Sequence, residues 1–153
     1  AAGAGCNLAL ACDIVLASDA ARFGNVFTRI GLIPDCGGHF FLPRLVGFHK
    51  AAELMFTGEI IDAHEAERLG LINRVVPDTE LAKQARELAE RLARGPTRAI
   101  GLCKRTMNLG ICADLETVLE AEAEGQGLAR QTEDHWEGVQ AFLEKRPAHF
   151  TGK

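Results

Sequence analysis

The sequence predicts an α/β fold in which residues 1–77 form a small portion with strands and residues 78–153 form a helical portion. Three short stretches rich in β-branched and aliphatic residues are confined to the first portion. In the second portion, apolar residues recur at helical spacing. With 153 residues, 47% of them hydrophobic, the chain has enough apolar content to fill a core.

Turn-forming residues divide the first portion into short elements. Asp62, with Glu65 three residues later and Gly70 beyond, has the spacing of a capped helix. Pro43 is expected near the first turn of the preceding helical stretch, where proline is tolerated. The predicted elements are a helix at 6–12, a strand at 14–17, an extended piece at 21–26, a loop at 29–38, helices at 39–47, 49–58 and 62–70, and a strand at 71–76.

The second portion reads as four helices, of which the first carries a stripe of Leu and Ala at helical spacing. Asp114 and Thr132 are the expected N-caps of the last two. The predicted ranges are 79–94, 97–109, 114–130 and 132–146. Three β pieces cannot form a stable sheet alone, so we expect partner strands outside this sequence. The start without Met, inside a Gly/Ala-rich motif, likewise suggests the middle of a longer protein.

Charge and cysteine content exclude several classes of function. Lys and Arg total 17 against 21 Asp and Glu, so a net charge of −4 predicts no nucleic-acid partner and no anionic membrane surface. No apolar run is long enough to span a bilayer. Five cysteines without a Cys-x-x-Cys pair indicate reduced thiols in a cytoplasmic protein. Five scattered histidines give no metal-ligand spacing, so no metal is expected.

Two short motifs are candidates for chemistry. Gly3, Ala4 and Gly5 precede a predicted helix, so backbone N–H groups there can receive an oxyanion, although tight packing is the commoner role of such glycines. Asp35, in GLIPDCGG, has two open interpretations: a turn-former or N-cap, or a general base. Phe150 and Lys153 follow Pro147 and could belong to a disordered tail or contact a ligand.

Six separated segments, in order and spacing, resemble the crotonase superfamily, whose members are enoyl-CoA hydratases and isomerases. They are AAGAGCNLALACDIVLAS, ARFG, GLIPDCGG, LPRLVG, LMFTGEIIDAHEAERLGLINRVV and GVQAFLEKRPAHFTGK. Within the family, the GLIPDCGG loop and the FTGK ending are most similar to the 1,2-epoxyphenylacetyl-CoA isomerases of phenylacetate catabolism.

The resemblance implies a crotonase-like ββα spiral, with its N-terminal turns absent from this sequence, followed by a C-terminal helical trimerisation region. It also implies an acyl-CoA thioester substrate, a homotrimer or hexamer, and no cofactor, since coenzyme A is part of the substrate. One N–H of the oxyanion hole falls on Ala4, flanked by Gly3 and Gly5. The second donor falls upstream of this sequence, and Phe150 and Lys153 match a possible CoA contact.

The sequence departs from the hydratase pattern at both family glutamates, which fall at Asn7 and Phe27. Asp35 matches the single carboxylate that the family's isomerases use. Asn7, Phe27, Cys36 and Gly37 would then line the substrate pocket. We expect an isomerase that shifts a double bond or opens an epoxide, with a hydratase and a catalytically silent binding protein as alternatives.

Overall fold

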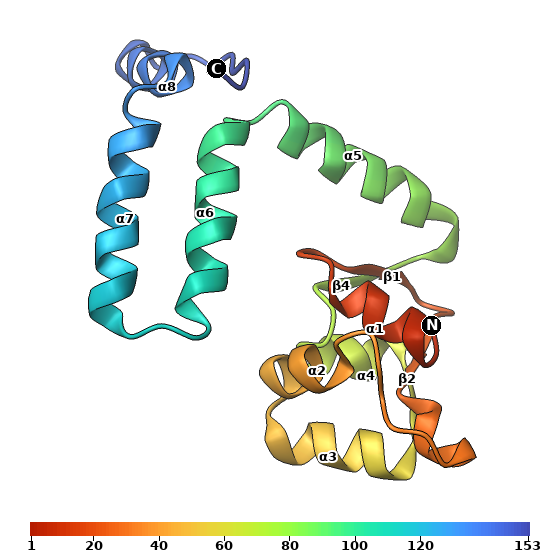
Figure 1. Cartoon of the computed structure of the whole chain (residues 1–153). Coiled ribbons are helices and arrows are strands. Elements are labelled where there is room, and N and C mark those ends of the chain that lie inside the picture. The colour runs from red at the N-terminus through yellow and green to blue at the C-terminus, as the bar shows by residue number, and fades with distance from the viewer. The chain divides into compact units, whose positions relative to one another are not determined.

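The computed structural model describes all 153 residues, which form two compact units, Ala1–Ala85 and Arg86–Lys153 (Figure 1). All four strands lie in the first unit, and the boundary between the units falls within helix α5 (Leu81–Ala93). The other helices are α1 (Ala4–Leu10), α2 (Gly38–Val46), α3 (Phe48–Thr57), α4 (Ala63–Arg68), α6 (Thr97–Gly110), α7 (Leu115–Ala129) and α8 (Glu133–Glu144). Two short 3₁₀ helices, η1 (Val26–Ile30) and η2 (Asp78–Glu80), complete the helical elements.

The strands form two separate two-stranded sheets. Strand β1 (Leu16–Ser18) runs parallel to β4 (Arg74–Val76), and β2 (Arg22–Gly24) runs antiparallel to β3 (Ile60–Asp62). Three of these strands overlap the three predicted β pieces, whereas β3 was not predicted. Its three residues follow the end of α3, and the last of them, Asp62, is also the N-cap of α4, so the run is too short for a β pattern.

Helix starts follow the predicted capping residues. The Asp62 side chain accepts a hydrogen bond from the Glu65 N–H, at 2.8 Å, and Asp114 and Thr132 cap α7 and α8 in the same way. One expectation was wrong: α2 begins at Gly38, so Pro43 lies inside the helix rather than near its first turn. Proline removes one backbone donor at that point.

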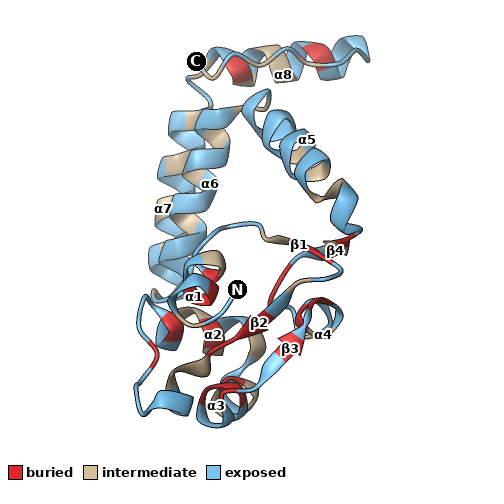
Figure 2. Ribbon diagram, turned by 90° about the vertical axis from the view of Figure 1, so that its right-hand side faces the viewer, coloured by how far each residue is buried: buried red, intermediate tan, exposed pale blue.

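The buried core is concentrated in the first unit (Figure 2). It joins β1, β2, β3 and helices α1, α2, α3 and α4, and its most enclosed large side chain is Leu42 of α2. Helix α1 packs against α2, which fixes the loop before α2 relative to the turn before α1. The fully buried apolar members are Cys6, Leu10, Ala17, Phe23, Leu42, Ala51, Leu54, Met55, Ile61, Ala63, Ala66, Leu71 and Ile72.

In the second unit, α6 packs along α7 as a helical hairpin, and α8 follows with the C-terminal tail against it (Figure 1). Asp134 and Ala141, both in α8, are the buried residues of this unit. Helices α5, α6 and α7 contain no fully buried residue. None of the helices combines the length and apolar character that crossing a membrane requires.

Candidate active site

The Gly-rich turn before α1 leaves a backbone donor at Ala4. Gly3 adopts a positive φ of 56°, which only glycine takes readily, and donates its own N–H to the Gly24 carbonyl at 2.9 Å. Ala4 is the first residue of α1, so its N–H has no acceptor within the helix. The turn can therefore offer the Ala4 N–H to an oxyanion, whereas the Gly3 N–H is already used.

Phe27, in η1, lies against this turn. A Cβ placed on Gly3 would meet Cζ of the Phe27 ring at 3.6 Å, an ordinary packing distance. Phe27 is only partly buried. The structure thus brings together two of the positions that the sequence assigned to the site.

Asp35 begins a tight turn that leads into α2. The Asp35 carbonyl accepts the Gly38 N–H at 2.9 Å, and the two central residues, Cys36 and Gly37, have positive φ values of 47° and 81°. Two consecutive positive φ angles define a type I′ turn. Gly37 is the N-cap of α2 and no side chain caps that helix, so the interpretation of Asp35 as an N-cap is wrong.

The Asp35 carboxylate is exposed and neighbours the Cys36 thiol. A side-chain hydrogen bond from the thiol to Asp35, together with the negative charge of Asp35, raises the pKa of Cys36. A thiol in this setting stays protonated more readily and is a poorer nucleophile. A thiolate at Cys36 is therefore disfavoured beside Asp35.

Asn7 is the most enclosed polar side chain near this turn. It has no exposed surface, and its Nδ2 donates to the Asp35 carbonyl at 2.8 Å, joining positions 28 residues apart. Its Oδ1 is buried without a hydrogen-bond partner in the chain. The Asn7 amide also packs on Gly38, where a Cβ would overlap it. This contact was not foreseen in the sequence, which assigned Asn7 only to the pocket lining.

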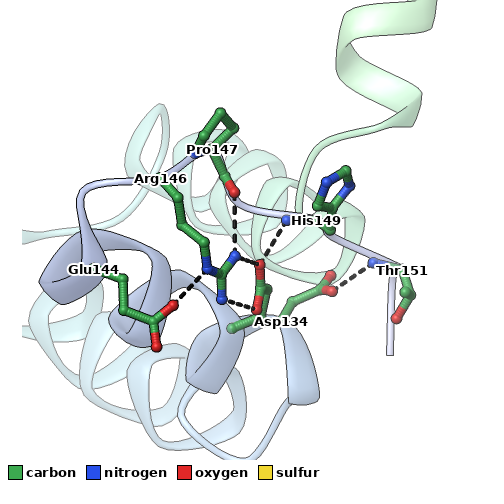
Figure 3. A network of polar contacts seen from close by, with 7 residues as sticks. Asp134, Glu144, Arg146, Pro147, His149 and Thr151 are labelled. Carbon is green, nitrogen blue, oxygen red and sulfur yellow. Dashed lines mark hydrogen bonds and ion pairs between the residues drawn. The ribbon is translucent and has the colours of Figure 1, made fainter.

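A second group of contacts holds the C-terminal tail against α8 (Figure 3). The two oxygens of buried Asp134 accept the N–H groups of Thr151 and Gly152, at 2.7 and 2.9 Å. Glu137, one helical turn later, accepts the His149 N–H at 2.8 Å. Neither carboxylate was identified from the sequence; two acids three residues apart beside the tail were the available signal.

Arg146 completes this network. Its guanidinium contacts Glu144 (Figure 3). It also forms a two-point ion pair with Glu137. The hydrogen bonds from Arg146, and then that from the His149 N–H, lower the pKa of Glu137 from 4.5 to about 2. The tail is therefore docked by charged partners, and the alternative of a disordered tail is wrong for residues 149–152.

The last two predicted ligand contacts, Phe150 and Lys153, lie in the docked tail of the second unit. The Phe150 ring packs on Gly138, where a Cβ would lie 3.5 Å from the ring. Lys153 lines an open cavity of about 630 Å³ together with Arg98, Thr132 and other residues of α6, α7 and α8. Within this unit, two cations and the acidic Glu133 thus border one cavity. No three His, Cys, Asp or Glu side chains converge as metal ligands.

The chain matches the enoyl-CoA hydratase/isomerase family model over residues 1–153 and belongs to this family. A "Probable enoyl-CoA hydratase" of Rhodobacter capsulatus is 50% identical over the whole chain and 60% of its own length. The 1,2-epoxyphenylacetyl-CoA isomerase of Escherichia coli is 46% identical over 58% of its length, and the crotonyl-CoA hydratase of Syntrophomonas wolfei is 40% identical over 59%.

Solved structures agree with this assignment. An enoyl-CoA hydratase from Bacillus anthracis superimposes with a TM-score of 0.96 at 40% identity, over all of this chain and 59% of that one. An enoyl-CoA hydratase/isomerase from Cupriavidus metallidurans gives 0.94 at 42% identity, over 99% of this chain and 57% of that one. The predicted crotonase fold is therefore confirmed. The chain spans about three fifths of the length of these relatives.

Proposed function

We propose that the protein containing this chain is an acyl-CoA isomerase that moves a proton through the single carboxylate of Asp35. The observation that carries the proposal is the arrangement at the Asp35 turn. Asp35 is the only acidic residue among the predicted site positions. By the resemblance to the family, Asn7 and Phe27 fall where the hydratases have their two glutamates. A base that takes a proton and returns it to another carbon needs no second carboxylate.

The chemistry follows from the acidity of the carbon next to a thioester. Asp35 removes a proton from C2 of a 3-enoyl thioester, and the electron pair spreads into a dienolate. The proton returns at C4, so the double bond moves from C3–C4 to C2–C3 without any net loss or gain of atoms. The Ala4 N–H would stabilise the oxyanion, and each such donor contributes about 3 to 4 kcal/mol to catalysis.

Phe27 favours a substrate whose acyl group is apolar or aromatic. Its partly exposed ring beside the Gly3 turn would face the acyl chain near the thioester. The 46% identity to the Escherichia coli 1,2-epoxyphenylacetyl-CoA isomerase favours a ring-bearing substrate and epoxide opening within phenylacetate catabolism. Phe150 and Lys153, held by the docked tail, are the proposed CoA contacts. We further propose a cytoplasmic homotrimer or hexamer and no separate cofactor.

A hydratase is the second candidate because the relative with 50% identity carries that name. Hydration adds water across the double bond and ordinarily requires one group to activate the water and another to protonate carbon. With Asn7 and Phe27 at the glutamate positions, only Asp35 is available for both tasks. A catalytically silent binding protein is the third candidate, and it would show neither activity.

The test uses the full-length protein with two substrates, a 3-enoyl-CoA and crotonyl-CoA. We expect the wild type to convert the 3-enoyl-CoA into the 2-enoyl-CoA and to hydrate crotonyl-CoA poorly. Asp35→Asn should lower kcat for isomerisation by about 100-fold or more, within the usual range for loss of a general base. Acyl-CoA binding should stay nearly unchanged.

Glu116→Gln serves as the matched control because Glu116 is an exposed carboxylate of α7. It should leave the isomerase rate at the wild-type value. Full isomerase activity in Asp35→Asn would overturn the assignment of the base. Efficient hydration of crotonyl-CoA by the wild type would replace the isomerase with the hydratase.

A further inference from the structure

The turn that carries Asp35 is strained at Cys36. Cys36 has a φ of 47°, in the left-handed region that non-glycine residues rarely adopt. The first central position of a type I′ turn prefers Asn, Asp or Gly, and Cys is none of these. The backbone that orients the proposed base is therefore held in a conformation that its own sequence does not favour.

A hydrogen bond from the Asn7 amide helps to hold the turn in this strained conformation. The Asp35 carbonyl accepts two hydrogen bonds, one from the Gly38 N–H inside the turn and one from Asn7 Nδ2 outside it. Gly38 lies against the Asn7 amide with no room for a Cβ, so helix α2 is seated directly on this side chain. The second hydrogen bond fixes the orientation of the Asp35 peptide group from α1.

Burying the Asn7 side chain also lowers the stability of the fold. The side chain is fully buried, and its Oδ1 has no partner within the chain. A buried oxygen without a partner lowers the stability of a protein, so burial alone does not favour an amide at this position.

We propose that Asn7 is a positioning residue, which holds the strained Asp35–Gly38 turn so that the Asp35 carboxylate points at the substrate. This inference rests on the proposed function, since it assigns Asn7 a role in the same proton transfer. Asn7 does not need to touch the substrate, because it acts through the Asp35 backbone.

The test is Asn7→Leu in the full-length protein, with Leu8→Ala as the control. Leu8 is a neighbouring residue of α1 whose side chain is exposed. We expect Asn7→Leu to lower kcat by about 10- to 100-fold with an unchanged KM, because small misplacements of a catalytic group cost this much. The melting temperature is measured beside kcat for both variants, so that a loss of kcat at an unchanged KM in a folded protein is separated from loss of the fold.

A double-mutant cycle with Cys36→Asn distinguishes strain from other effects. This change creates Asn-Gly at 36–37, the pair that type I′ turns prefer. The kcat penalty of Asn7→Leu should then shrink by about fivefold, because the turn no longer needs the external hydrogen bond. An equal penalty in both backgrounds, or a normal kcat in Asn7→Leu, would overturn the proposal.

Asp35→Asn separates the two hypotheses. If Asp35→Asn is inactive while Asn7→Leu is fully active, the positioning role fails and the proposed function stands. If Asp35→Asn is fully active, the proposed function fails first, and a loss of activity in Asn7→Leu would no longer support positioning of a base.

Discussion

At the scale of single residues, the Cys36 thiol reports on the charge of its neighbour. The Asp35 carboxylate raises the pKa of Cys36, so the thiol forms less thiolate at a given pH than an isolated cysteine. Asp35→Asn removes the charge and should lower the pKa of Cys36 toward its ordinary value. Alkylation of Cys36 by iodoacetamide between about pH 7.5 and 9 should therefore become faster in the variant.

The measurement is the alkylation rate of the Cys36 peptide, followed by mass spectrometry over that pH range. Cys112 is an internal reference, because it is exposed and lies in the other unit. Its rate should be the same in both proteins. An unchanged or slower rate at Cys36 in Asp35→Asn would show that the carboxylate does not act on this thiol.

Single residues also show which contacts could not be predicted from the sequence. Pro34, Gly37 and Gly38 indicated a loop around Asp35, and the structure confirms a turn there. The hydrogen bond from Asn7 to the Asp35 carbonyl joins positions 28 residues apart. It depends on how α1 packs on α2 and on the missing Cβ of Gly38, and no local pattern reveals either. The sequence thus located the turn without revealing what holds it.

At the scale of elements, the contact between α8 and the C-terminal tail should weaken at low pH. The pKa of Glu137 is lowered from 4.5 to about 2 in the folded state. The carboxylate therefore favours the docked tail fully above about pH 4.5, and this contribution is lost as the pH falls toward about 2. The His149 N–H, which donates to Glu137, should become more solvent-accessible over that interval.

Amide NMR of His149 across this pH range provides the measurement. Glu137→Gln should remove the titration and leave the amide less protected already at neutral pH. Glu133→Gln is the matched control, since Glu133 is an exposed acid in the first turn of the same helix. A His149 amide that stays protected at about pH 2 in the wild type would contradict the assigned role of Glu137.

Element boundaries were predictable where capping chemistry is local. Asp62, Asp114 and Thr132 each accept the backbone N–H that their spacing indicated. Strand β3 was missed because its three residues gain strand geometry only by pairing with β2, which is distant in sequence. The docked tail was missed for the same kind of reason, because its hydrogen bonds are made by side chains of α8.

At the scale of the whole molecule, the two units differ in how they can be stable. The first unit encloses a continuous apolar core, whereas α5, α6 and α7 contain no buried residue. The apolar stripe of the first of these helices and the breaks and capping residues of the others predicted all three correctly. Neither signal could indicate what covers their apolar side chains, and Met107, Leu115 and Leu119 remain exposed in the chain.

Hydrogen exchange of the chain 1–153 should therefore differ between the helices that line the core and those that contain no buried residue. Helices of up to 15 residues are marginal in water, and the packing of α6 along α7 leaves neither helix a fully buried residue, so amides of α5, α6 and α7 should exchange rapidly. Amides of α3 and α4, seated on the core, should exchange about 100-fold more slowly. The measurement is peptide-resolved exchange at low protein concentration, where copies of the chain do not cover one another. Equal protection in both units would mean that the α6–α7 hairpin is stable by itself, contrary to what its burial indicates.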